Sequence, residues 1–122
     1  MKKLITLLSM VVMLAFSSQA AYYLVGNEPF GNGWDPSTGV EMTQNADGTY
    51  SFKATINGSI WFVMADGLAD AGDWTTFNDN LRIGPTGGDE TVTADTWITT
   101  QKSGGDHGAY KFTGSGSEYI IT

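Results

Sequence analysis

Two tryptophans in this sequence stand among turn-forming residues, where large apolar side chains are unusual. Trp34 lies in Gly31–Ser37, a segment whose other residues all favour turns, and Trp74 lies in a stretch rich in Asp and Gly. Burial of an indole ring stabilises a domain, so two tryptophans in loops require a reason. Either each loop covers the end of the core, or the two rings are flat platforms for the apolar faces of sugar rings. Physical reasoning alone leaves both interpretations open.

Polar residues that could hydrogen-bond sugar hydroxyls follow Trp74 in the sequence. Arg82 is the only arginine of the chain, and its planar guanidinium presents five donors in a fixed fork. Asn78 and Asp79 come shortly before it. The hypothesis of a carbohydrate site therefore has Trp34 and Trp74 as stacking platforms, with Arg82, Asn78 and Asp79 as hydrogen-bonding partners.

The residue types that catalysis requires are not arranged for it. The only histidine, His107, lies in a glycine-rich segment that should be a solvated loop, whereas a Ser–His–Asp triad needs a buried, oriented histidine. The chain contains no cysteine that could act as a nucleophile. Most carboxylates adjoin Gly or Asn in turns, where solvation is the default. We therefore expect a protein that is not an enzyme and that needs no cofactor.

Several aspartates fall in one stretch of the sequence, which raises the question of a calcium site. Asp66, Asp70, Asp73 and Asp79 offer the hard oxygen ligands that Ca²⁺ prefers. No stretch fits the EF-hand pattern, and Ca²⁺ requires about six or more converging oxygens. We expect solvated loop carboxylates here and assign no metal site.

The first 20 residues have the three parts of a secretory signal peptide. Lys2 and Lys3 give a positive start, an apolar run follows, and small residues end at Ala20, where we expect cleavage. The apolar run is about 13 residues long, short of the roughly 20 that span a bilayer. Since there is no cysteine, we expect neither a lipoprotein anchor nor a disulfide. The predicted product is exported to the periplasm, the medium or the cell surface, without membrane insertion after cleavage.

Removing 20 of the 122 residues leaves 102, a single domain over residues 21–122. Four basic residues then stand against 13 acidic ones, a net charge near −9. Such a charge repels nucleic acid and anionic membrane surfaces, so neither is an expected partner. Neutral ligands such as oligosaccharides and polysaccharides remain compatible with it.

Short apolar runs bounded by turn residues predict strands rather than helices. Thr49–Ala54 alternates between polar and apolar residues, and Asn45–Gly48 before it is a turn signal. Asn57-Gly58 is the strongest hairpin signal and predicts two strands, 49–56 and Ile60–Ala65, around a tight turn. The other runs are Tyr22–Val25, Val40–Thr43, Thr96–Gln101, Ala109–Thr113 and Ser117–Thr122. About seven short strands of this spacing predict an all-β fold, an antiparallel immunoglobulin-like β-sandwich.

The stretch Asp66–Asp95 interrupts this rhythm. Its residues are mainly polar or glycine with scattered apolar side chains, which predicts one long ordered binding loop. Trp61 and Trp97 fall in predicted strands and should pack into the core or against a neighbouring strand. The last run, Ser117–Thr122, has no closing turn after it. Either the sequence is a C-terminally truncated part of a longer protein, or this strand pairs at a sheet edge.

Five short motifs follow one another in an order that resembles a known family. They are Tyr23–Gly26, Asn32–Pro36, Met42–Thr43, Asp47–Phe52 and Ile60–Met64. The series resembles the starch-binding β-sandwich domains of SusE/SusF-type outer-membrane proteins. More distantly, it resembles the family 48 carbohydrate-binding modules, which include the glycogen-binding domain of AMP-activated kinase. The resemblance covers the chain from Tyr22 to about Trp74.

The resemblance implies a sandwich that binds α-glucans of the starch or glycogen type without hydrolysing them. Trp34 falls on the tryptophan of the family's Asn-Gly-Trp motif, a sugar-stacking platform, and Trp74 falls near a second one. The family's lysine contact is absent, because Trp61–Val63 occupies its place, which leaves Arg82 or Lys102 as substitutes. The resemblance favours the platform interpretation of the loop tryptophans. It also implies a larger surface glycan-uptake assembly as a partner.

Two other functions remain open at this point. The domain could be a structural or adhesive β-sandwich of a cell-surface protein, in which the loop tryptophans cover the core or contact proteins. It could also be an accessory module, as a fragment of a larger glycan-processing enzyme.

Overall fold

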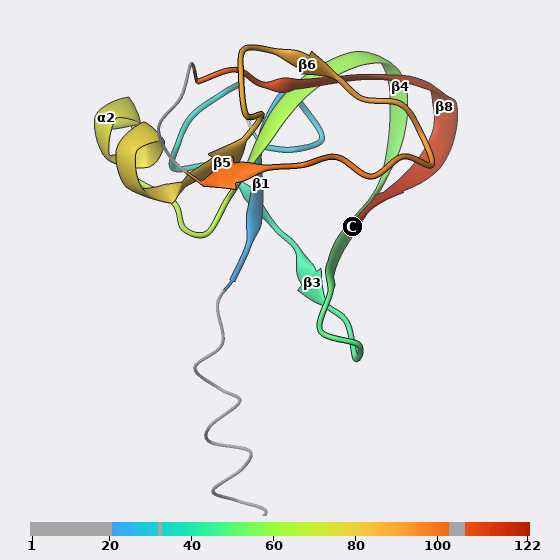
Figure 1. Ribbon diagram of the computed structural model, residues 1–122, viewed down its shortest axis with the longest axis horizontal. Coiled ribbons are helices and arrows are strands. Elements are labelled where there is room, and N and C mark those ends of the chain that lie inside the picture. Colours follow the sequence, from blue (N-terminus) through green and yellow to red (C-terminus); the bar gives the residue numbers. More distant parts are fainter. Residues whose placement is uncertain (1–20, 32, 103–106) are drawn as a thin grey trace, which may run out of the picture.

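The computed structural model describes residues 21–31, 33–102 and 107–122, and the fold is all-β and sandwich-like, as the sequence predicts (Figure 1). The predicted signal peptide, residues 1–20, lies outside the described residues. Within the described ranges, no helix has the length and apolar character needed to cross a membrane. The strands are β1 (Tyr23–Gly26), β2 (Val40–Glu41), β3 (Thr43–Gln44), β4 (Tyr50–Ala65), β5 (Arg82–Gly84), β6 (Glu90–Thr91), β7 (Gln101–Lys102) and β8 (Tyr110–Ile121).

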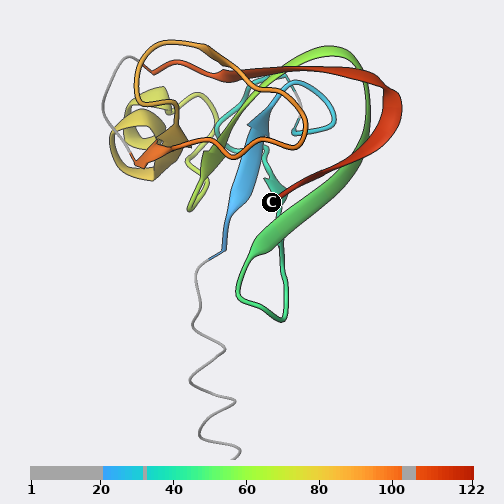
Figure 2. The same ribbon diagram turned by 45° about the vertical axis from the view of Figure 1, so that its right-hand side comes forward.

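The sheet is organised around β4, which is by far the longest strand. Along one path the strands follow the order β2-β1-β4-β5-β7, and β8 pairs with β4 over most of the length of both strands. The β4–β8 register runs from the pair Phe52 and Ile121 to the pair Phe62 and Tyr110. Both strands curve together through one wide bend (Figures 1 and 2). All strand pairs are antiparallel except β6 with β8, which is parallel.

The predicted hairpin at Asn57-Gly58 is wrong, because both residues lie inside the continuous strand β4. The left-handed backbone of Gly58 (φ 83°) is used within the strand instead of in a tight turn. On the opposite strand the register shifts: Ile56 pairs with Ser117 and Asn57 with Ser115, which leaves Gly116 (φ 88°) as an extra residue. This is a β-bulge, which bends the strand pair. The hairpin predicted at Asn45–Gly48 is confirmed, since β3 pairs with the start of β4 across it.

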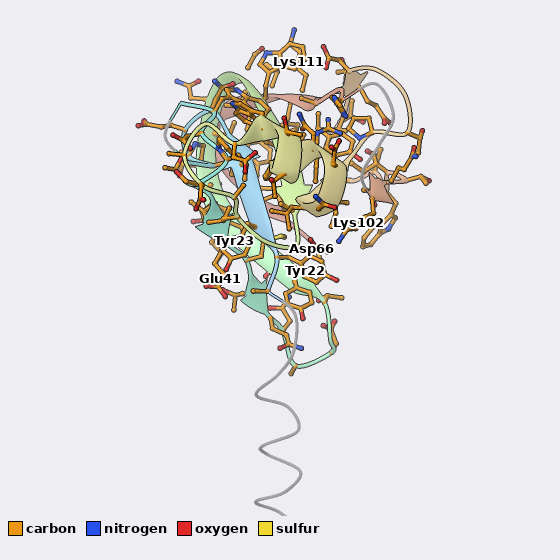
Figure 3. All side chains as sticks on the ribbon, turned by 90° about the vertical axis from the view of Figure 1, so that its left-hand side faces the viewer. Tyr22, Tyr23, Glu41, Asp66, Lys102 and Lys111 are labelled. Carbon is orange, nitrogen blue, oxygen red and sulfur yellow. The ribbon has the colours of Figure 1, made fainter. Side chains whose placement is uncertain are left out.

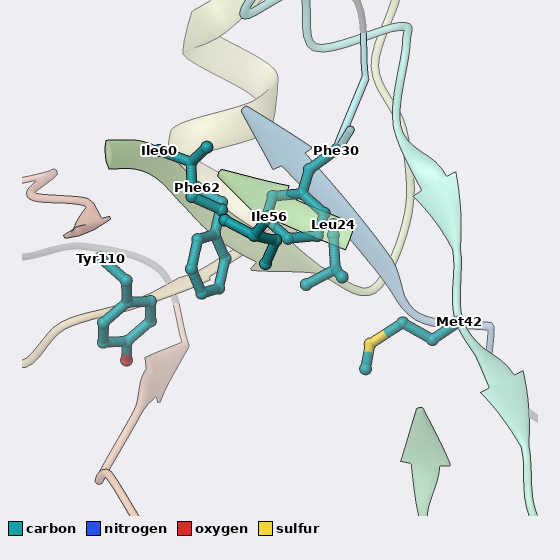
Figure 4. Packing of buried hydrophobic residues seen from close by; sticks show 7 residues of the cluster. All are labelled: Leu24, Phe30, Met42, Ile56, Ile60, Phe62 and Tyr110. Carbon is teal, nitrogen blue, oxygen red and sulfur yellow. The ribbon is translucent and has the colours of Figure 1, made fainter. Parts of the chain in front are cut away.

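The main core fills the concave side of the bent strand pair. Its seven buried residues come from β1, β4, β8 and the loops between β1 and β3, as Figure 4 shows. Phe62 lies 5.0 Å from Phe30 and 5.7 Å from Tyr110, measured between ring centroids. Such tilted aromatic contacts add to the stabilisation from burial alone. The seven residues are Leu24, Phe30, Met42, Ile56, Ile60, Phe62 and Tyr110.

A second, smaller cluster lies on the other face of the sheet. Its fully or almost fully buried members are Val25, Val63, Ala65 and Phe77. Successive residues of a strand point to opposite faces, so Leu24 packs in the main core while Val25 packs in the second cluster. Burial on both faces explains the continuous apolar sequence at the end of β4.

The predicted long loop, 66–95, is ordered but is not a single loop. It contains a helical segment, α2 (Trp74–Thr76) continued by the π-helical η1 (Phe77–Leu81), and then the short strands β5 and β6. The expectation of no helix is therefore wrong for these eight residues. Phe77 belongs to the second cluster and Trp74 and Leu81 pack against it, and their spacing of three and four residues is typical of one face of a helix.

The predicted strand Thr96–Gln101 is also wrong, except at its last residue, where β7 begins. Thr96 donates its side-chain hydroxyl to the carbonyl oxygen of Thr93 at 2.6 Å, and Asp95 has a left-handed backbone (φ 61°). These features make a local turn in place of a ladder. By contrast, the two predicted runs 109–113 and 117–122 join into the single strand β8.

Candidate functional site

The structure brings Trp34 and Trp74 to the same hydrophobic cluster. Both side chains are half-buried and pack against the second cluster, although 40 positions separate them in the sequence. Their two loops are tied together, because the backbone N–H of Ala69 donates to the carbonyl oxygen of Pro36 at 3.0 Å. Two aromatic rings, each with part of its surface open to solvent, therefore lie over one face of the sheet. We call this region the Trp34–Trp74 surface.

The loop of Trp34 is held by its neighbour Asp35. The Asp35 carboxylate accepts hydrogen bonds from the backbone N–H of Ser37 at 2.9 Å and from the Ser37 hydroxyl at 2.7 Å. The backbone N–H, followed by the hydroxyl, lowers the pKa of Asp35 below its ordinary value. Trp34 itself has a left-handed backbone (φ 61°), which is unusual for a bulky residue and strained. The fixed turn holds this strained tryptophan in place.

Trp74 begins the helical segment and is fixed by a helix cap. The Asp73 carboxylate accepts from the backbone N–H of Thr76 at 3.0 Å, as an N-cap residue does. This bond lowers the pKa of Asp73. The Trp74 ring meets the buried Phe77 ring edge-on, with centroids 5.5 Å apart and planes at 86°. The contact with Phe77 thus anchors the indole while the residue keeps partial exposure.

The predicted polar partners Asn78 and Asp79 lie on η1, directly after this anchor. Asn78 is half-buried and Asp79 is exposed. They follow Trp74 by four and five residues on one helical segment, which places them about one turn from it. The amide and the carboxylate supply both hydrogen-bond donors and acceptors next to Trp74.

Arg82 does not belong to this surface, which corrects the prediction. The residue is only 4% exposed, and its guanidinium packs so closely on Gly84 that a Cβ atom there would lie 2.7 Å from Nη1. Burial lowers the pKa of the Arg82 guanidinium, and the nearby Tyr110 and Asp89 act in the opposite direction. Arg82 begins β5, and the packing of its guanidinium against Gly84 in the same strand was not indicated by the sequence pattern.

Lys102, the other predicted substitute for the family's lysine, is engaged elsewhere. Its ammonium group forms an ion pair with the Asp66 carboxylate, which connects β7 to the turn after β4 (Figure 3). This contact occupies the head group of Lys102. The hydrogen-bonding set that remains at the Trp34–Trp74 surface is therefore Asn78 and Asp79.

Trp61 and Trp97, both predicted to lie in strands, have different surroundings in the structure. Trp61 is half-buried in β4 and pairs across the strands with Lys111, whose Nζ lies 5.3 Å from the indole centroid, so its predicted packing is confirmed. The prediction that Trp97 is packed is wrong, since its side chain is 88% exposed. The run Thr96, Trp97, Ile98, Thr99 does not alternate, which was the available sign that it is no half-buried strand.

Trp97 lies at the rim of a cleft that sequence reasoning did not find. The cleft has a volume of about 470 Å³ and lies between residues 92–100 and the end of β8, with the main core as its floor. Its floor and walls include Phe62, Phe112 and Ile98, and its rim includes Glu118. Volumes of this size are typical of binding sites. The cleft involves none of the residues of the Trp34–Trp74 surface.

The described residues do not group potential metal ligands together, and the only histidine is exposed. No three Asp, Glu or His side chains gather as a metal site within residues 21–31, 33–102 and 107–122. His107 is exposed, with a left-handed backbone (φ 55°), next to segment 103–106, which lies outside the described residues. The arrangement that the structure does offer is aromatic surface with amide and carboxylate neighbours.

Comparison with known proteins returns no match: no protein-family model, curated protein or solved structure matches this chain. The likeness to starch-binding domains therefore rests on the sequence motifs alone.

Proposed function

We propose that this protein is a non-catalytic carbohydrate-binding domain, which holds an α-glucan of the starch or glycogen type at the Trp34–Trp74 surface. The observation that carries the proposal is the exposure of the indole rings. None of the four tryptophans is buried, and Trp34 and Trp74 pack against one cluster. If all the rings were covered, no stacking platform would exist. The choice of an α-glucan comes from the sequence resemblance.

The geometry suits stacking on a sugar ring. The indole of Trp74 is held by its contact with Phe77, and its backbone is held by the cap at Asp73, so little side-chain entropy remains to be lost on binding. The Asn78 amide can then donate to and accept from hydroxyl groups of the sugar, and the Asp79 carboxylate can accept from them. The chain has a formal net charge of −7, which a neutral ligand does not oppose.

A native gel containing glycogen tests the proposal with matched variants. We expect glycogen to retard the wild-type protein and to retard Trp74→Ala much less. Truncation of a central aromatic contact costs about 1 kcal/mol or more, which corresponds to at least about fivefold weaker binding. Trp97→Ala is the matched control, because it removes an indole outside this surface.

Three outcomes of the gel have distinct meanings. Wild-type protein that glycogen leaves unretarded would contradict α-glucan binding. Equal retardation of the wild type and Trp74→Ala would remove Trp74 from the site. Loss of retardation only in Trp97→Ala would move the sugar site to the cleft.

The structural or adhesive alternative is favoured by one observation, the open cleft with its exposed Trp97. That cleft lies apart from the Trp34–Trp74 surface and shares no residue with it.

A further inference from the structure

The second feature of this molecule that lacks a partner is the outer edge of β8. One edge of β8 pairs with β4 from Tyr110 to Ile121. Its other edge pairs with β6 only at Tyr110 and Lys111. Across the described ranges, no strand pairs with that edge from Phe112 onward. An unpaired strand edge presents N–H and C=O groups that can accept another strand.

One backbone N–H group in the middle of β8 is already hydrogen-bonded to a side chain. The hydroxyl of Tyr119 accepts a hydrogen bond from the backbone N–H of Ser115 at 3.1 Å. Beyond this bond, the end of β8 from Ser117 to Ile121 has no strand partner on its outer edge. Residues 118–122 of the same stretch form one wall of the cleft.

The exposed apolar side chains gather at the same place. Trp97 and Ile120, 88% and 63% exposed, are the two large apolar side chains that stand out as exposed in the described chain. Both residues border the cleft, and the Ile120 side chain lies on the face of β8 opposite to Tyr119 and Ile121, which pack against the main core. Exposed apolar groups that gather beside a cleft indicate a contact surface for another molecule. An open backbone edge, a cleft and two exposed apolar side chains thus coincide.

We propose that the cleft and the β8 edge together accept an extended polypeptide strand from a partner protein. The partner's backbone pairs with residues 117–121, and its alternate apolar side chains enter the cleft. The Asp95 carboxylate at the cleft favours a basic residue beside the apolar ones. Glu118 already lies 3.8 Å from the Lys53 ammonium group, measured from Oε1 to Nζ, on the exposed surface.

Other occupants fit these features less well. A small apolar molecule would fill the cleft but would leave the backbone edge of β8 unpaired. A second copy of this chain would bring together two molecules of net charge −7, which repel one another. A basic, extended peptide satisfies the backbone, the apolar cleft and the charge at once.

Binding of a synthetic peptide tests the inference. The probe is acetyl-Lys-Val-Thr-Val-Thr-Val-Lys-amide, titrated into the purified protein while tryptophan emission is recorded. We expect a saturable blue shift, because the peptide covers the exposed Trp97, and we expect the shift to be lost in Trp97→Phe. A peptide N-methylated at alternate residues keeps the side chains but removes the N–H donors on one edge. It should bind at least about tenfold more weakly.

A pair of protein variants locates the site. Ile120→Lys places a positive charge on the cleft and should weaken binding of the basic peptide at least about tenfold. Ala46→Lys adds the same charge at an exposed turn residue outside the cleft and should leave binding unchanged. If Ile120→Lys fails to fold, judged by circular dichroism, Ile120→Thr replaces it, and the two peptides still decide the question on the wild type.

The results that would overturn the inference are specific. Absence of a shift up to about 1 mM peptide would exclude a strand of this chemistry. Equal binding of the N-methylated peptide would mean that only side chains are recognised, as for a small-molecule cleft. A dimer of the protein alone, dissociated by Ile120→Lys in sedimentation, would identify a second copy as the occupant.

Discussion

At the scale of single residues, Arg82 illustrates how burial changes a functional hypothesis. The sequence marks it out as the only arginine, and such a residue is a reasonable candidate for binding sugar hydroxyls. In the structure it is buried, and its Nη2 atom has no hydrogen-bond partner. Its neighbour Tyr110 is buried as well, and burial raises the pKa of that phenol to about 12. The side chain thus belongs to the interior of the domain.

Replacement of Arg82 by methionine tests this assignment. A buried charge without full pairing costs free energy, and an apolar residue of similar volume is often neutral or stabilising. We expect Arg82→Met to leave the free energy of unfolding unchanged or to raise it by about 1 kcal/mol, measured with urea. Retardation by glycogen should be unchanged. A loss of retardation in a variant of unchanged stability would return Arg82 to the binding site.

At the scale of elements, the bend of β4 and β8 organises the molecule. The same bend gives the concave side that holds the main core and the cleft at its edge. The glycines at the bulge adopt backbone conformations that other residues rarely reach, which is why the bend lies there. The hairpin prediction at Asn57-Gly58 correctly assumed a left-handed backbone at Gly58, but that backbone lies within a strand and not in a turn.

Gly116→Ala tests the importance of the bulge. Because Gly116 has φ 88°, we expect the alanine variant to lower the free energy of unfolding by about 1 kcal/mol or more. Gly87→Ala is the control, since no atom lies near a Cβ there and its φ is not left-handed. That variant should change stability by less than about 0.5 kcal/mol. Equal stabilities of the two variants in urea would contradict the role of the bulge.

At the scale of the whole molecule, the domain is held by two apolar clusters on opposite faces and contains no cysteine. Its surface carries carboxylates that are hydrogen-bonded in turns and at a helix cap. The pKa values of Asp35, Asp47 and Asp73 are all lowered, in each case mainly by hydrogen bonds from a residue two or three positions ahead. The stability of the fold should therefore decrease in acid.

The direction of this response follows from linkage. A carboxyl group whose pKa is lower in the folded state contributes stability above its unfolded pKa, here 3.8, and that contribution is lost as the pH falls through the folded pKa. We expect the melting temperature to be nearly constant between about pH 5 and 8 and to fall below about pH 4. Asp73→Asn should show a smaller fall than the wild type and Asp70→Asn. An identical fall in all three proteins would contradict the role of Asp73.

The sequence alone determined the fold class and the turn at Asn45–Gly48. Alternation in Thr49–Ala54 and the turn residues Asn45–Gly48 fix their structure through backbone preferences of neighbouring residues, so both were predictable. The two loop tryptophans were also found from sequence, because an indole among turn residues is a local anomaly. That they share one cluster was not predictable, because the contact joins segments 40 positions apart.

Tertiary structure decided everything that depends on which groups meet over long distances in the chain. It placed Asn57-Gly58 inside a continuous strand, since β8 pairs with β4 from Phe52 to Phe62, and it buried Arg82, whose guanidinium packs against Gly84. It exposed Trp97, because the polar turn at Thr93 and Thr96 replaces the strand. Residue type sets local backbone preference, whereas burial and exposure arise only when distant segments pack together.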